Sequence, residues 1–306
     1  MTTLASSSKV RLAGKMAASL VVPSLPVLFW WKTSVDDRRE RAEEVRTKIR
    51  IPNVQTIDDL IVEKCKPGDV LLFDRRCHKC AAGPMAALSC LVARGLLCGE
   101  DKGGIRSVEV GSFDHCGVVV PGDTENKAQA ADPSNLLLLE TTASDGVVAR
   151  PLLTRLEMSQ SRSVLLLPLS SPGERRNDED YEPSDKTVRL QQRLVRNLTA
   201  FRCKWVEESE KQNYAGGHST LGIFGALGYT MNLHRTSPAP VSPSAWLVLS
   251  ALQEAGAAEN ISGRTSLETR VEDFLRDHRF NEKDTVHLRP GWKFLTPVIV
   301  RETARS

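Results

Sequence analysis

Four short apolar runs, each next to turn-forming residues, constrain the fold of this chain most strongly. They occupy residues 70–73, 116–120, 136–139 and 164–169. The first follows a Pro-Gly-Asp turn at 67–69, and the second precedes another Pro-Gly-Asp turn at 121–123. Apolar runs of this length between turns are typical of strands that are buried within a sheet.

Two further segments have helical patterns. Residues 187–205 mix polar and apolar side chains without any Gly or Pro. Residues 245–255 place apolar side chains on one helical face, and Gly256, a residue that commonly ends helices, follows them. Strands and helices in this arrangement predict an α+β domain, with a mixed or antiparallel sheet packed on helices.

The first 35 residues form a separate segment, which is basic and contains no acid. Its apolar stretch, 17–31, is interrupted by Pro23 and Pro26 and is shorter than the roughly 20 residues of a spanning helix, so we expect no transmembrane helix. The composition fits a mitochondrial presequence. Residues 27–31 also fit an apolar arm that docks on a membrane surface or a partner protein, and an unstructured tail is the third alternative.

Two segments are rich in charge, one before the predicted domain and one within it. Residues 36–60 begin with acids followed by bases, a pattern typical of a solvated helix, and we interpret them as a charged helical connector. The domain itself is expected to span 61–301. Within it, residues 170–186 are rich in charge, Pro and Ser and predict an exposed loop.

Charge and cysteine content bear on partners and location. A net charge of +3 over 306 residues is too small to favour nucleic acid as a partner. Seven cysteines cannot all pair within one chain, which favours reduced thiols and an intracellular location, either mitochondrial or cytoplasmic. Association with a membrane surface through residues 17–31 stays an open alternative.

Three polar features at the ends of predicted elements point to chemistry. His115 begins the second apolar run, Glu140 follows the four leucines of the third, and Ser244 precedes the late helix. A histidine can take a proton from a nucleophile at a helix start while a carboxylate holds its ring in one tautomer. The helix start also supplies N–H groups that stabilise an oxyanion.

The order of these parts resembles a known family. The chain reads KPGDVLLF at 66–73, FDHCGVVV at 113–120, LETT at 139–142, DGVV at 145–148 and SAWLVLSALQEAG at 244–256. This set resembles the circularly permuted NlpC/P60 papain-like hydrolases, in particular the YiiX-like group. The resemblance covers roughly 61–301 and implies a permuted papain-like fold, with His115 as the base and Glu140 as the polar partner of that histidine.

The chain departs from the family at the nucleophile. The resemblance implies a cysteine at the start of the late helix, where this chain has Ser244. A cysteine there ionises readily, whereas a serine hydroxyl needs its proton removed during the attack. We therefore expect a degenerate site; a plain helix N-cap is the alternative role for Ser244.

Other cysteines offer weaker alternatives. Cys77 and Cys80 have the spacing of half a zinc site, but the second pair that zinc requires is missing, so we expect no metal and no cofactor. Cys116 follows His115 directly. Because neighbouring strand residues point to opposite faces, we expect Cys116 to face away from the catalytic side as a core thiol.

Three functions follow as hypotheses. The first is a catalytically degenerate, papain-like pseudoenzyme that serves as a structural or interaction subunit, with protein partners in a larger assembly. The second is an active hydrolase or acyltransferase of amide or ester bonds that uses Ser244 with His115 and Glu140. The third is a lipid-binding module.

Overall fold

The computed structural model describes most of the predicted domain and part of the charged segment before it. The described residues are 28–29, 32–33, 35–37, 39–47, 56–74, 113–122, 135–142, 146–159, 161, 163–176, 182–214, 240, 242–259, 266–275 and 286–302. They form an α+β structure in which helices cover an antiparallel sheet, as the sequence predicted.

The sheet has six strands in the order β4-β3-β2-β1-β5-β8, and every neighbouring pair is antiparallel. The strands are β1 (Val70–Asp74), β2 (His115–Pro121), β3 (Leu136–Thr142), β4 (Gly146–Pro151), β5 (Ser163–Leu167) and β8 (Val298–Glu302). A second, two-stranded sheet pairs β6 (Leu169–Ser170) with β7 (Lys293–Phe294).

All four predicted apolar runs are strands. The fourth run is divided, because β5 ends at Leu167 and β6 begins at Leu169. The residue between them is Pro168, which has no N–H to donate to a ladder. The sequence pattern did not predict β4 and β8, the two edge strands of the large sheet.

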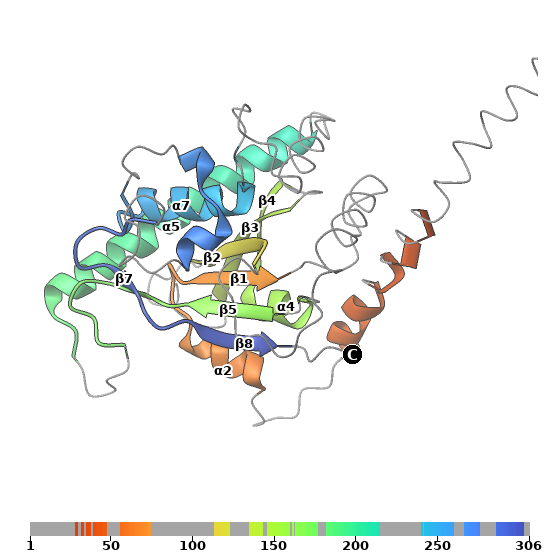
Figure 1. The fold of residues 1–306 in the computed structure, drawn as a ribbon, viewed down its shortest axis with the longest axis horizontal. Helices are drawn as coiled ribbons and strands as arrows, with labels where there is room; N and C mark the ends of the chain where they lie inside the picture. The colour runs from red at the N-terminus through yellow and green to blue at the C-terminus, as the bar shows by residue number, and fades with distance from the viewer. Residues whose placement is uncertain are drawn as a thin grey trace, which may run out of the picture.

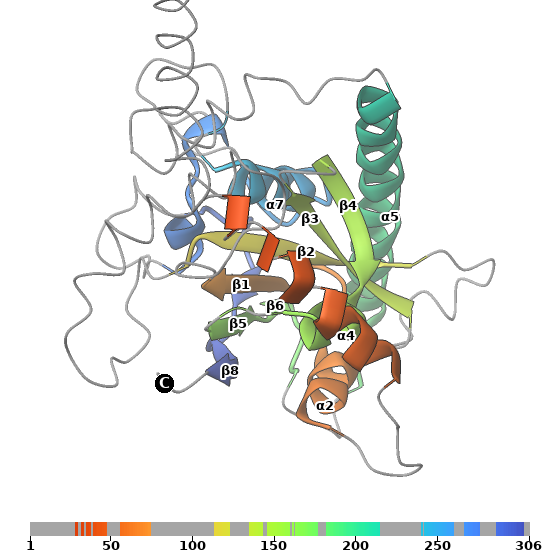
Figure 2. The same cartoon turned by 90° about the vertical axis from the view of Figure 1, so that its right-hand side faces the viewer.

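Helices lie on both faces of the large sheet (Figures 1 and 2). One face carries α5 (Asp185–Tyr214) and α7 (Pro243–Glu254). The other carries α2 (Ile57–Lys64) and α4 (Leu152–Glu157). Two short 3-10 helices, η3 (Ser266–Glu268) and η4 (Val271–Phe274), follow α7 in the chain. Coverage on both faces explains why the central strands are continuous apolar runs and not alternating ones.

The side chains of the central strands divide between two cores. Val70, Leu72 and Cys116 pack with α5 and α7. Leu71 and Phe73 pack with α2 and α4. We call these the α7 face and the α4 face of the sheet. The alternation fixes the face of every polar residue on these strands.

Arg176, from the charged segment 170–186, holds the Pro-Gly-Asp turn before β1 in place through hydrogen bonds. Gly68 has φ +97°, and a Cβ there would lie 2.9 Å from Leu169 Cδ2. The fully buried Asp69 carboxylate accepts two hydrogen bonds of 2.6 Å from the guanidinium of Arg176. It also accepts from the N–H groups of Lys66 and Leu169, at 2.9 and 2.8 Å.

This arrangement corrects the interpretation of residues 170–186 as an exposed loop for residues 170–176 alone, because residues 182–186 are exposed and residues 177–181 lie outside the described part of the chain. The Arg176 side chain is 8% exposed, and Glu174 pairs with Lys66 at 2.8 Å. Residues 170–176 thus form an ordered turn against the start of β1. The physical reason is the buried carboxylate of Asp69, which requires a counter-charge.

Both ends of α7 have the signals expected of helix termini. Ser242 is the N-cap, its Oγ accepts from the Ala245 N–H at 3.4 Å, and Pro243 begins the helix. The alternative that Ser244 is the N-cap is therefore wrong. At the other end Gly256 has φ +80°, and the N–H groups of Gly256 and Ala257 bond the carbonyls of Gln253 and Leu252.

Residues before the domain are helical where the structure describes them. The described residues between 28 and 47 have helical backbone, and most have exposed or half-buried side chains. The guanidinium of Arg41 donates to the Glu157 carbonyl oxygen at 3.2 and 3.3 Å. No described helix combines the length and the apolar character that crossing a membrane requires.

Candidate functional site

His115 and Glu140 form a buried pair on the α4 face. His115 opens β2 directly opposite Phe73 of β1, while Glu140 of β3 lies opposite Gly117. Residues 115 and 117 share a face, so both polar side chains point to the same side of the sheet. His115 Nε2 lies 2.8 Å from Glu140 Oε2, and the two side chains are 2% and 1% exposed.

Arg155 of α4 completes the cluster. Its Nε donates to Glu140 Oε1 at 2.6 Å, and its second terminal nitrogen donates to Oε2 at 3.0 Å. Its guanidinium carbon lies 4.5 Å from the centroid of the Phe73 ring, and the Phe73 and His115 ring centroids are 5.8 Å apart. A terminal nitrogen of Arg150, on β4, is 3.7 Å from Glu140 Oε1.

Neither arginine was predicted from the sequence. The sequence feature that could have pointed to an arginine partner was Glu140 itself, since a carboxylate buried in a strand of leucines requires a counter-charge. Arg150 and Arg155 follow within 15 residues, in the edge strand and short helix that come next in the chain. Nothing in the sequence pattern distinguished them from other basic residues of the chain.

The electrostatics of the cluster keep Glu140 ionised. Burial opposes ionisation, but the hydrogen bond from His115 and the charge of Arg155 outweigh it and hold the pKa of the Glu140 carboxyl well below its ordinary value. A carboxylate only accepts hydrogen bonds, so the ring nitrogen that faces it, Nε2 of His115, carries a proton. In the neutral ring Nδ1 is then the proton acceptor, which is the state a general base requires.

Ser244 occupies the second position of α7, on the opposite side of the sheet. Its side chain is 4% exposed, and its Oγ accepts from the Cys116 N–H at 3.4 Å, a long N–H···O distance. Its Oγ also lies 3.4 Å from Ser242 Oγ. Both residues are described, and no hydrogen bond joins Ser244 to His115.

The structure therefore brings two of the three candidate residues together. His115 and Glu140 are in direct contact on the α4 face, whereas Ser244 belongs to a helix that packs on the α7 face. Ser244 does lie next to the strand of His115, because it accepts a hydrogen bond from the following residue. The catalytic roles of the three residues stay predictions.

Cys116 faces away from His115 as expected, but α7 covers the face on which it lies. It is a fully buried core thiol, as predicted, and it points away from His115. However, it lies on the α7 face, in the same core as residues of α7, and not on the face away from Ser244. The alternation of strand side chains was correct, but the face that α7 covers is a property of the tertiary packing.

The candidate metal ligands Cys77 and Cys80 lie outside the described residues. Among the residues whose positions are described, no three His, Cys, Asp or Glu side chains cluster in a way that suits a metal ion. Burial raises the pKa of the Cys65 thiol to about 12, so this thiol is protonated at neutral pH.

Comparison with known proteins gave no relative: no family model, no curated protein and no solved structure matches the chain.

Proposed function

We propose that this chain is a papain-like pseudoenzyme, an α+β domain of permuted papain-like topology that serves as a structural or interaction subunit. One observation carries the proposal. The hydroxyl oxygen of Ser244, at the position where the resembled family has its cysteine, accepts a hydrogen bond from a backbone N–H, and no hydrogen bond joins it to the base His115.

The topology supports the proposed fold. The histidine strand β2 comes early, the strand of its polar partner, β3, lies beside it, and the helix with the nucleophile position comes late in the chain. The same order underlies the resemblance in the sequence. The Pro-Gly-Asp turn, which is part of that resemblance, closes β1 against β2 through the Gly68 N–H and the Val119 carbonyl, 2.8 Å apart.

The chemistry of serine supports the loss of activity. A serine nucleophile requires a base within hydrogen-bond reach during attack, together with oxyanion donors. The observed partners of Ser244 Oγ are the Cys116 N–H and the Ser242 hydroxyl, and neither is a base. Because Glu140 also binds Arg155, the pair of His115 and Glu140 has a structural role that does not depend on catalysis.

An active serine hydrolase or acyltransferase is the second candidate function. The observation that favours it is the contact between His115 Nε2 and the Glu140 carboxylate, which is the relation of a base to its orienting partner. Activity would require His115 Nδ1 and the Ser244 hydroxyl to approach each other when a substrate binds.

Labelling with a fluorophosphonate probe and hydrolysis of a p-nitrophenyl ester distinguish the two functions. For the pseudoenzyme we expect no labelling of Ser244, and equal background hydrolysis by the wild type, His115→Ala and Ser244→Ala. The matched control is Ser250→Ala in the same helix. Labelling that Ser244→Ala abolishes, together with hydrolysis lost in both variants, would overturn the proposal and establish the hydrolase.

A further inference from the structure

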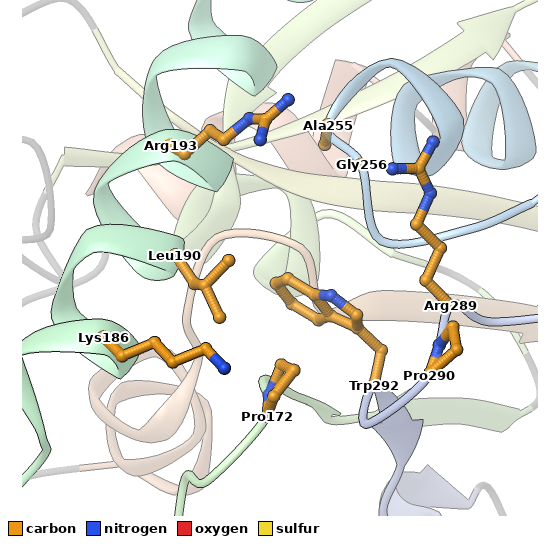
Figure 3. Close-up of a pocket in the computed structure, with 9 residues that line it drawn as sticks. All are labelled: Pro172, Lys186, Leu190, Arg193, Ala255, Gly256, Arg289, Pro290 and Trp292. Carbon is orange, nitrogen blue, oxygen red and sulfur yellow. The ribbon is translucent and has the colours of Figure 1, made fainter.

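A cavity of about 310 Å³ lies where the first turns of α5 meet the C-terminal end of α7 (Figure 3). Its walls include Lys186 and Arg193 of α5, together with Arg289 and Trp292 from the segment before β7. The cavity is remote from the candidate site. Gly256 in its wall is twelve residues from Ser244, which is roughly 18 Å along a helix.

Among the described residues that line the cavity, three are cations and none is Asp or Glu. The cations are Lys186, Arg193 and Arg289. Within the described part of the chain, no carboxylate pairs with any of the three. Figure 3 shows the guanidinium groups of Arg193 and Arg289 on either side of the turn at Ala255 and Gly256. Like charges gathered without counter-charges repel one another, so an anion bound between them is stabilised.

The helix end beside the cavity does not account for these cations. Cationic side chains often bond the last carbonyls of a helix. Here the N–H groups of Gly256 and Ala257 already bond the carbonyls of Gln253 and Leu252, at 3.0 and 2.8 Å. Arg193 and Arg289 are both exposed, so solvent and a ligand can reach their guanidinium groups.

Apolar side chains line part of the cavity. The indole of Trp292 faces Leu190, and Pro172 lies below the ring in Figure 3. Trp292 is half-buried, packs against the core of the α7 face and also lines the cavity. A fixed indole next to cations is suited to a ligand with both a ring and a negative charge.

We propose that this cavity binds a small organic phosphate that carries a planar ring. Arg193 and Arg289 donate to the phosphoryl oxygens, because a guanidinium presents paired N–H groups that match them. Trp292 packs against the ring of the ligand, and Lys186 supplies a further charge. A volume of about 310 Å³ is at the small end of ligand sites and admits one such molecule.

The test is isothermal titration calorimetry of the full chain with inorganic phosphate, phenyl phosphate and adenosine 5′-monophosphate. Both ring-bearing phosphates are expected to bind at one site, more tightly than inorganic phosphate. Arg193→Gln and Arg289→Gln should each weaken this binding at least about tenfold, since hydrogen bonds to charged groups are the strong ones. Trp292→Leu should remove the advantage of the ring-bearing ligands over phosphate.

Arg189→Gln is the matched control, because Arg189 is exposed on α5 but does not line the cavity. It should leave binding unchanged. Lys186→Gln provides a second test at an exposed side chain whose loss does not threaten folding. The proposal is overturned if no saturable binding occurs at millimolar ligand, if Arg189→Gln weakens binding as much as Arg193→Gln, or if inorganic phosphate binds as tightly as the ring-bearing ligands. None of these outcomes depends on whether Ser244 is catalytic.

Discussion

A single buried carboxylate, Glu140, organises one face of this molecule. Its carboxylate accepts hydrogen bonds from His115 of the neighbouring strand and from Arg155 of α4, and the residue is 1% exposed. Removing one partner of such a buried cluster costs several kcal/mol, because an uncompensated charge stays behind. The cluster therefore contributes to folding whether or not His115 ever acts as a base.

The effect of pH on Glu140→Gln tests this role. The folded-state pKa of Glu140 is lowered, so its carboxylate stabilises the fold above the ordinary carboxyl pKa of about 4.3, and this stabilisation is lost as pH falls toward the lower folded value. At pH 7 the variant should lose about 3 kcal/mol of unfolding free energy, because Arg155 loses its counter-charge. The difference from wild type should shrink below about pH 4.

Urea denaturation at a series of pH values measures both quantities. Glu210→Gln is the control, since Glu210 is exposed on α5, and it should change the unfolding free energy by less than about 0.5 kcal/mol at every pH. A difference between Glu140→Gln and wild type that stays constant down to pH 3 would contradict the assigned pKa direction.

At the scale of elements, the turn before β1 is held by a contact between distant parts of the chain. Arg176 joins the turn at Asp69 to the carbonyls of Lys64 and Leu169, at 2.8 and 3.1 Å. One side chain thereby ties together the end of α2, the start of β1 and β6. The short sheet of β6 and β7 is attached to the large sheet at this point.

Arg176→Met is expected to lower the free energy of unfolding by about 3 kcal/mol or more, because Asp69 is left buried and unpaired. The neighbouring, exposed Arg175 is the matched control, and Arg175→Met should cost less than about 1 kcal/mol. Chemical denaturation followed by circular dichroism measures both values. Equal losses of unfolding free energy in the two variants would show that Arg176 has no special role in stabilising the turn.

At the scale of the whole molecule, the segment before the domain presents apolar side chains to solvent. Leu28 is 41% exposed and Phe29 is 71% exposed, and both belong to the acid-free first 35 residues. Such side chains are costly to leave in water, which supports an arm that docks on a protein partner or on a membrane surface.

Co-sedimentation with liposomes that contain anionic lipid separates these partners. If the arm binds a membrane surface, the full chain should partition onto vesicles, and a chain without residues 1–35 should stay in the supernatant. We expect Phe29→Ser in the full chain to reduce partitioning, because it removes exposed apolar area. Equal partitioning of the full and shortened chains would exclude a membrane role for the arm and leave three alternatives, which are docking on a protein, a mitochondrial presequence and an unstructured tail.

The central sheet was the most predictable part of the molecule. The runs that became β1, β2 and β3 are covered on both faces, so all their residues had to be apolar and the pattern was unambiguous. The edge strand β4 was missed, since its half-buried residues mix Val and Ala with Arg150 and show no clear alternation. Helix α5 was predicted at 187–205 but spans Asp185–Tyr214, because its polar last turns have no apolar pattern to mark them.

The sequence by itself determined the central strands β1, β2, β3 and β5 and the end of α7, since period and turn residues are local properties. Only the tertiary structure decided that Arg155 and Arg176 supply the counter-charges for buried carboxylates, and that α7, with Ser244, packs on the face away from His115. These facts depend on which face of the sheet each helix covers. That choice is made by the packing of residues far apart in the chain, for which no local pattern exists.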